Sequence, residues 1–150
     1  MALELENLHH MPTIKVAMTP FPFFVEIDAS VAAARAMMQE NEIQHLPVTE
    51  DGALVGVLSA RDVRLLEVAR RGQSRDLGSV RDACVRDVYV VDIDTPLDDV
   101  LGELAESHRG AALVVKNAKL VGILTTSDAC RLLADLLQQR FPPPDDDTAA

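Results

Sequence analysis

The chain has 150 residues, of which 48% are hydrophobic, 25% are charged and 3% are aromatic. This length suits one domain or two small units that share a core, and the composition excludes a disordered chain or a fibre. Because tryptophan is absent, we expect a core of Ala, Val, Leu, Ile and Met.

The net charge of −10 argues against non-specific binding to nucleic acid or to an anionic membrane surface. The longest apolar runs, such as residues 111–115, are much shorter than the roughly 18 residues of a membrane span. Residues 1–7 also lack the pattern of a secretion signal. We therefore expect a cytoplasmic protein without a membrane span.

The two cysteines, Cys84 and Cys130, share no metal-ligand spacing with each other or with a histidine. Two cysteines in a reducing compartment are more often buried thiols than a disulfide. We therefore expect two buried thiols and no metal site.

The chain aligns with itself without a gap when Val25 is placed on Val91. Residues 25–28 (Val-Glu-Ile-Asp) fall on residues 91–94 (Val-Asp-Ile-Asp), and residues 54–58 (Leu-Val-Gly-Val-Leu) fall on residues 120–124 (Leu-Val-Gly-Ile-Leu). The polar tetrapeptides that follow these last two blocks match in the same register. Several blocks match in this single ungapped alignment, which we call the duplication register. Such a match predicts an internal duplication of the chain.

Each repeat predicts a short strand, a helix with apolar residues at three-to-four spacing, a hairpin and a second helix. In the first repeat these are a strand at 24–27, a helix capped by Ser30, hairpin strands at 46–49 and 54–58, and a helix at 61–71. In the second repeat they are a strand at 90–93, a helix capped by Thr95 with Pro96 at its first position, hairpin strands at 111–115 and 120–124, and a helix at 127–139.

The predicted fold class is α/β (α+β), with two repeats that each contain a three-stranded sheet and two helices. A unit of about 55 residues buries little surface alone, so we expect the repeats to pack about a pseudo-twofold axis. The expected divisions are a leader at 1–13, repeats at 14–71 and 80–139, a linker at 72–79 and a disordered acidic tail at 140–150.

The last helix of each repeat begins with a Ser/Thr-x-x-Asp pattern, at Ser59 and Asp62 and again at Thr125 and Asp128. This pattern is typical of a helix N-cap. It also suits a nucleotide, because a carboxylate can accept hydrogen bonds from ribose hydroxyls while the helix start receives phosphate oxygens. Two copies after nearly identical strands favour the nucleotide-binding interpretation.

The order of these blocks, with Ala-Met-Thr-Pro at 17–20 and His-Leu-Pro-Val at 45–48, resembles a tandem pair of cystathionine-beta-synthase (CBS) domains. The resemblance covers about residues 14–137. A tandem pair in that family forms a Bateman module, with two clefts in which adenine nucleotides or related adenosyl ligands bind. The resemblance implies a regulatory module that commonly forms a homodimer and acts on a partner protein.

The resemblance also implies site residues: Asp62 and Asp128 would hold ribose hydroxyls, with Ser59 and Thr125 near phosphate. Each base pocket would come from the opposite repeat. The implied residues facing Asp128 are Met18, Phe23, His45, Leu46 and Pro47, and those facing Asp62 are Cys84, Tyr89 and the backbone around Gly110, Ala111 and Ala112.

The candidate phosphate-binding cations are Arg61, His45, Arg64 and Arg109. Arg61 lies inside the first Ser/Thr-x-x-Asp pattern, whereas the second pattern has the neutral Ser127. We therefore expect the Asp62 site to prefer the more highly charged ligand, if both sites bind.

The second repeat departs from the family pattern, with Cys-Val-Arg at 84–86 and Ala-Ala-Leu at 111–113 in place of Met-Thr-Pro and His-Leu-Pro. The wall that faces Asp62 is therefore the less certain one. The Asp128 site is the favoured one, and a single occupied site stays open.

We expect binding of AMP, ADP, ATP or S-adenosylmethionine without catalysis. Two alternatives stay open: an interaction adaptor in which Asp62 and Asp128 only cap helices, and a small nucleotide-using enzyme. The sequence contains no nucleophile elbow, P-loop or G-x-G-x-x-G pattern, which argues against the enzyme.

Overall fold

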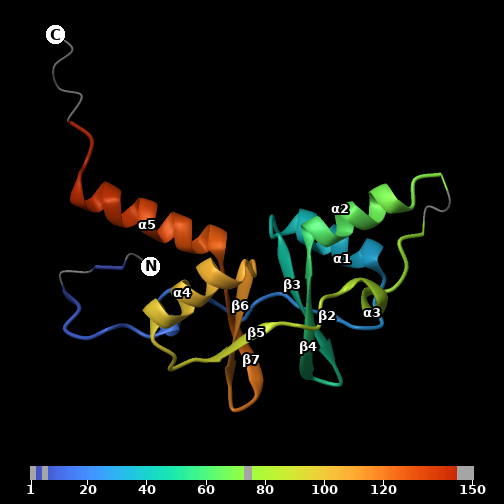
Figure 1. The fold of residues 1–150 in the computed structure, drawn as a ribbon, viewed down its shortest axis with the longest axis horizontal. Helices are drawn as coiled ribbons and strands as arrows, with labels where there is room; N and C mark the ends of the chain where they lie inside the picture. Colours follow the sequence, from blue (N-terminus) through green and yellow to red (C-terminus); the bar gives the residue numbers. More distant parts are fainter. Residues whose placement is uncertain (1–2, 5–6, 73–75, 145–150) are drawn as a thin grey trace, which may run out of the picture.

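The computed structural model describes residues 3–4, 7–72 and 76–144. Two units of similar build lie side by side, with their hairpins adjacent at the centre and their helices toward the outside (Figure 1). The same order of elements occurs in both units. Residues 73–75 of the predicted linker and 145–150 of the predicted tail lie outside the described residues.

In the first unit the sheet order is β2-β3-β4, with β2 parallel to β3 and β3 antiparallel to β4. Its elements are β2 (Val25–Glu26), α1 (Val31–Glu40), β3 (His45–Glu50), β4 (Ala53–Ser59) and α2 (Ala60–Ala69). In the second unit the elements are β5 (Tyr89–Asp92), α4 (Leu97–Ser107), β6 (Ala111–Lys116), β7 (Lys119–Thr125) and α5 (Thr126–Arg140).

A segment that we call the leader from here on precedes each unit: residues 7–20 before the first, with the 3-10 helix η2 (Ile14–Val16) and the strand β1 (Thr19–Pro20), and residues 76–85 before the second, with the helix α3 (Val80–Ala83). The strand β1 pairs with β7, so the second sheet has four strands in the order β1-β7-β6-β5. Each repeat therefore contributes the predicted three strands, and one extra strand crosses from the leader of the first repeat.

The helix start that was predicted at Ser30 is confirmed, because Ser30 Oγ accepts a hydrogen bond from the Ala33 N–H at 3.0 Å. The predicted Thr95 cap of α4 is wrong. Pro96 takes the N-cap position, and no side chain caps the helix there. The Leu97 N–H instead donates to the Pro12 carbonyl at 2.8 Å. In the duplication register Pro96 takes the place of Ser30, so the N-cap position of α4 carries no side-chain acceptor, and Thr95 lies one residue before it.

Each leader packs against the other repeat. The Val31 N–H donates to the Gly78 carbonyl at 2.9 Å, and in the duplication register this bond is the counterpart of the bond from Leu97 to Pro12. The Val80 N–H donates to the Ala29 carbonyl at 2.9 Å, as the Ile14 N–H does to Thr95. These matched bonds confirm the predicted pseudo-twofold relation.

The same exchange covers the outer edge of each hairpin. Thr19 pairs with Ile123, and in the matched position Val85 and Val57 exchange two backbone hydrogen bonds at 2.9 Å. An uncovered edge strand leaves backbone groups unpaired and invites aggregation. The crossing leaders therefore satisfy the edges of β4 and β7.

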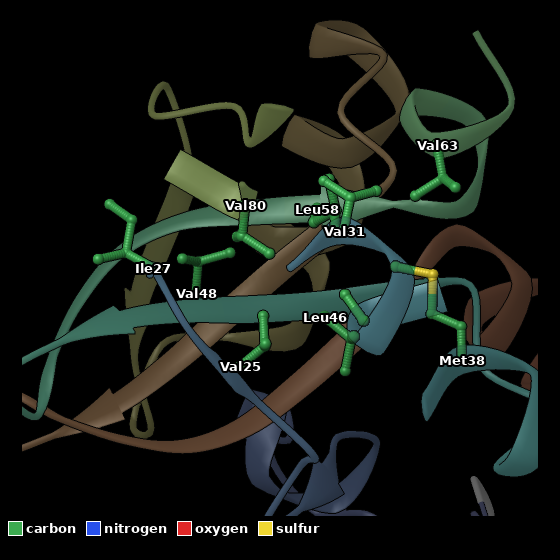
Figure 2. Close-up of a cluster of buried hydrophobic side chains, with 10 residues drawn as sticks. Val25, Ile27, Val31, Met38, Leu46, Val48, Leu58, Val63 and Val80 are labelled. Carbon is green, nitrogen blue, oxygen red and sulfur yellow. The ribbon is translucent and has the colours of Figure 1, made fainter. Parts of the chain in front are cut away.

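Each core also contains a side chain from the other repeat. Val80 is fully buried among the side chains of the first unit, as Figure 2 shows. Ile14, also fully buried, lies in the core of the second unit. Neither repeat therefore completes its core alone.

The helix α5 has no buried residue. Its Leu133 and Leu137 are 58% and 51% exposed, although the sequence places them on the apolar side of the helix. The expectation of two buried thiols is wrong for Cys130, which is exposed on α5, whereas Cys84 is half-buried. Only a small part of the surface of α5 packs against the second unit, and this leaves Cys130 exposed.

Candidate functional site

A cavity of about 700 Å³ lies between the two repeats, within the range of volumes of small-molecule sites. The first unit contributes the start of β3 and of α2, and the second contributes β5, the loop before β6 and the start of α5. Ten of the residues that the sequence analysis named for a site line it together: His45, Ser59, Arg61, Asp62, Arg64, Tyr89, Arg109, Gly110, Ala111 and Ser127.

Asp62 closes a capping box with Ser59 at the start of α2. The Asp62 N–H donates to Ser59 Oγ at 3.1 Å, while Asp62 Oδ2 accepts from the Ser59 N–H at 3.0 Å and from its hydroxyl at 2.7 Å. Within the part of the chain that the structure describes, Asp62 Oδ1 makes no hydrogen bond or ion pair. The capping interpretation is therefore correct, and one carboxylate oxygen is still available to a ligand.

Asp128 forms the matching capping box with Thr125 at the start of α5. Its Oδ2 accepts from the Thr125 N–H at 2.9 Å, and its N–H donates to Thr125 Oγ1 at 3.1 Å. The Oδ1 atom lies 3.8 Å from the Arg131 guanidinium. The two aspartates thus have the same backbone role and different surroundings.

His45 lies between the two capping boxes. Burial lowers the pKa of His45 below its ordinary value of 6.5, and the carboxylates of Asp62 and Asp128 oppose this shift. Its Nδ1 is buried and has no hydrogen-bond partner among the described residues. A Cβ atom on Gly110 would lie only 2.6 Å from His45 Nε2, so the ring requires glycine at this position.

In the variant His45→Gln, we expect the free energy of unfolding to fall less than in the wild type when the pH is lowered. Because the pKa of His45 is lowered in the folded protein, the unfolded chain takes up the proton first as the pH falls. In the wild type, the part of the free energy of unfolding that depends on neutral His45 is therefore present above pH 6.5 and is lost as the pH falls below it. Urea unfolding at about pH 7.5 and about pH 5.5 measures this difference. The exposed His108 gives the control variant His108→Gln, and an equal pH response in both variants would contradict the prediction.

Tyr89 supplies the aromatic wall of the cavity from β5. Partial burial raises the pKa of its phenol, with smaller contributions from Glu103 and Asp99, so the ring is neutral at physiological pH. A neutral, half-buried ring suits the face of a purine. Its counterpart Phe23 is 53% exposed.

The remaining predicted residues lie outside this cavity. Met18 packs over Gly122 of β7, and Cys84 lies in the matching place over Gly56 of β4. Leu46 and Pro47 are fully buried side chains of β3. Thr125 and Asp128 lie on the opposite side of the pseudo-twofold axis, which is the side that the sequence favours, whereas the cavity opens at Asp62.

Sequence reasoning missed several lining residues. Val57 and Val85, which pair with each other, line the cavity, as do Asp87 from the loop before β5 and Ser107 and His108 at the C-terminal end of α4. Only the departures of the second repeat from the family pattern signalled that this side differs. Arg64 and Arg109, which the sequence offered as candidate cations, do line the cavity.

The residues that the structure describes contain no group of three or more His, Cys, Asp or Glu side chains that could hold a metal ion. Over the same residues, no helix combines the length and the apolar character that a membrane crossing requires.

Relatives of known name share this sequence over most of its length. A zinc metalloprotease of Methanocaldococcus jannaschii is 30% identical over 134 residues, which are 89% of this chain and 36% of that protein. An inosine-5'-monophosphate dehydrogenase of Thermoplasma acidophilum is 30% identical over 122 residues, which are 80% of this chain and 22% of that protein. The chain therefore spans about a third or less of the length of these relatives.

Three solved structures share the fold. AcuB of Vibrio cholerae has a TM-score of 0.75 at 23% identity, covering 89% of this chain and all of that one. CBSX2 in complex with AMP has a TM-score of 0.68 at 27% identity, covering 83% and 97%. The CBS domain pair of MJ0100, in complex with 5'-methylthioadenosine and S-adenosyl-L-methionine, has a TM-score of 0.69 at 23% identity, covering 83% and 98%.

The sequence profile of the CBS domain matches twice, at residues 14–68 and 80–135. The two matched segments begin at η2 and α3, the elements that carry the exchanged core residues. The double match accounts for the duplication. The chain belongs to the CBS domain family, as a tandem pair of CBS domains.

Proposed function

We propose that this chain is a regulatory module that binds an adenosine-containing ligand in the cavity at Asp62 and passes its occupancy to a partner protein. The carrying observation is that both repeats line one cavity beside an aspartate with a free carboxylate oxygen. A ligand held by both repeats would favour one arrangement of the repeats over another. We place this role in the cytoplasm and assign the chain no catalysis.

The cavity offers what an adenosine needs. Tyr89 provides a face for the base, Asp62 Oδ1 an acceptor for ribose hydroxyls, and Ser59 lies at a helix start that suits phosphate. The ligands of two related structures, AMP in CBSX2 and 5'-methylthioadenosine with S-adenosyl-L-methionine in MJ0100, all contain adenosine. This shared moiety supports the ligand class.

Replacing Asp62 by asparagine is expected to weaken adenine-nucleotide binding by about tenfold to a hundredfold, because it removes the charge that strengthens the ribose hydrogen bonds. In the wild type, a nucleotide at about 100 times its Kd should add about 2.7 kcal/mol to the free energy of unfolding. Thermal shift and isothermal titration with AMP, ADP, ATP and S-adenosylmethionine measure both effects.

Asp128→Asn is the matched control, since it makes the same change in the second capping box. Loss of binding in Asp128→Asn alone would move the site to the other side of the axis. If none of these ligands binds the folded wild type, the adaptor alternative replaces the sensor. ATP consumption that is lost with a cavity mutation would instead favour an enzyme.

We further propose that the module forms a homodimer through α4 and α5. An apolar groove of about 690 Å³ runs between these helices and the leader, and Leu133 is exposed beside it. Leu133→Lys is expected to shift the protein to a monomer in sedimentation equilibrium, because a buried lysine in an apolar interface is costly. An unchanged mass, with Lys119→Ala as a control on β7, would place the interface elsewhere.

A further inference from the structure

The cavity at Asp62 is rich in basic side chains, although the chain carries a net charge of −10. Three arginines, Arg61, Arg64 and Arg109, line it with His45 and His108. The carboxylates that line it are those of Asp62 and Asp87. Because the whole molecule repels anions, an anionic ligand depends on a local cluster of this kind.

The two arginines of α2, Arg61 and Arg64, form no ion pair with a carboxylate among the described residues. Over the described part of the chain, the carboxylates that form ion pairs within 4.0 Å engage Arg35, Arg81, Arg109 and Arg131, and none engages Arg61 or Arg64. Arg109 does contact Asp87, at 3.1 Å. That pair is solvent-exposed on the aspartate side, so a phosphate can compete for the guanidinium.

The pseudo-twofold axis provides an internal comparison. In the duplication register, Arg64 corresponds to Cys130 and Arg109 corresponds to Ile43. The same register pairs His108 with Glu42. On the Asp128 side, the three matching positions therefore hold a thiol, an isoleucine and a carboxylate, whereas the Asp62 cavity has three basic side chains there.

Two other arginines, Arg61 and Arg131, contribute less to the difference in charge between the Asp62 side and the Asp128 side. Arg61 has Ser127 as its counterpart, and because Ser127 lines the Asp62 cavity, Arg61 lies close to the axis. Arg131 lies on the Asp128 side, but 3.8 Å from Asp128 Oδ1. The asymmetry in charge therefore rests on Arg64, Arg109 and His108.

We infer that the Asp62 cavity selects an adenine nucleotide with two or three phosphate groups, and that each chain binds one such nucleotide. This inference rests on the proposed function and specifies its ligand. A guanidinium can bind two phosphate oxygens at once, so arginines that lack a carboxylate partner favour a chain of phosphates over a nucleoside. The Asp128 side lacks the matching cations and takes no second polyphosphate.

The experiment compares ATP, ADP, AMP and adenosine by isothermal titration, using the full chain. In the wild type we expect ATP and ADP to bind at least tenfold more tightly than AMP and adenosine, with one site per chain, and AMP as tight as ATP would overturn the inference. Arg64→Gln is expected to weaken ATP binding about tenfold while changing adenosine binding less than twofold. The control Arg71→Gln removes the same charge just beyond the end of α2, and ATP binding should be unchanged.

Each outcome decides the question. Adenosine and ATP of equal affinity, two ATP molecules per chain, or equal effects of Arg64→Gln on both ligands would overturn the polyphosphate inference and leave the proposed function intact. If Arg71→Gln weakened ATP binding as much as Arg64→Gln does, the effect would come from net charge alone, and the polyphosphate inference would be overturned as well. Absence of binding by all four compounds and by S-adenosylmethionine would reject the proposed function itself.

Discussion

Replacing Ile14 by alanine is expected to lower the free energy of unfolding by about 2 to 5 kcal/mol. The side chain is fully buried in the core of the second unit, although it belongs to the leader of the first repeat. Its removal leaves a cavity beside residues such as Val100 and Leu124, which are also fully buried. The loss combines reduced apolar burial with the cost of that cavity.

Chemical denaturation of Ile14→Ala tests the exchanged core directly. Lys15→Ala is the control, because Lys15 lies next to Ile14 in η2 and is exposed, so its loss should stay within about 0.5 kcal/mol. We expect one cooperative transition, since each core needs a side chain from the other repeat. Two separate transitions, or equal losses in the two variants, would contradict the exchange.

Gly56→Ala is expected to destabilise the protein by about 1 to 3 kcal/mol, the usual cost of overpacking. A Cβ atom at this position would lie 2.8 Å from the Val85 carbonyl oxygen and 3.2 Å from Cys84 Sγ. That carbonyl accepts the hydrogen bond from the Val57 N–H at 2.9 Å. The methyl group therefore displaces backbone and weakens the pairing that joins the second leader to β4.

The matched variant Gly122→Ala is expected to cost less. Its Cβ atom would overlap the end of the Met18 side chain, which can rotate away because a thioether chain is flexible. Thermal unfolding of both variants compares a backbone obstacle with a side-chain obstacle at positions related by the duplication. A greater loss in Gly122→Ala would show that Met18 is held rigidly over β7.

Much of the fold could be predicted because the two repeats carry the same local signals. The hairpin turns illustrate this: Asp51 and Gly52 have φ values of 51° and 81°, and Asn117 and Ala118 have values of 50° and 63°. A two-residue hairpin turn requires such positive φ values. Glycine, asparagine and aspartate adopt them more readily than other residues, so the first turn is encoded locally, whereas Ala118 adopts its positive φ at a steric cost in the second.

The Thr95 cap could not be predicted correctly from local signals. Threonine followed by proline is a common helix start and favours Thr95 as the cap, whereas the comparison of the repeats places Pro96 on Ser30 and therefore at the N-cap position. The exchange of Ile14 and Val80 could not be predicted from local signals either. An apolar side chain in a pattern indicates burial and does not identify the core that receives it.

The candidate site divides in the same way. The repeated Ser/Thr-x-x-Asp pattern identified Asp62 and Asp128 with their caps, because capping depends on residues three positions apart. The sequence favoured the Asp128 side, since its expected wall in the first repeat matched the family pattern better. The structure has a cavity at Asp62, where loops and arginines from both repeats meet, and the binding measurements on Asp62→Asn and Asp128→Asn decide between the two sides.

By itself, the sequence determined the duplication, the strands and helices of each repeat, and the two capping aspartates, because these depend on periodicity and on neighbours close in the chain. Only the tertiary structure decided which leader completes which core, how far His45 is buried beside Gly110, and which side of the axis holds a basic cavity. These features depend on distances between segments that lie in different repeats, and the shape of such contacts is set when the two repeats pack together.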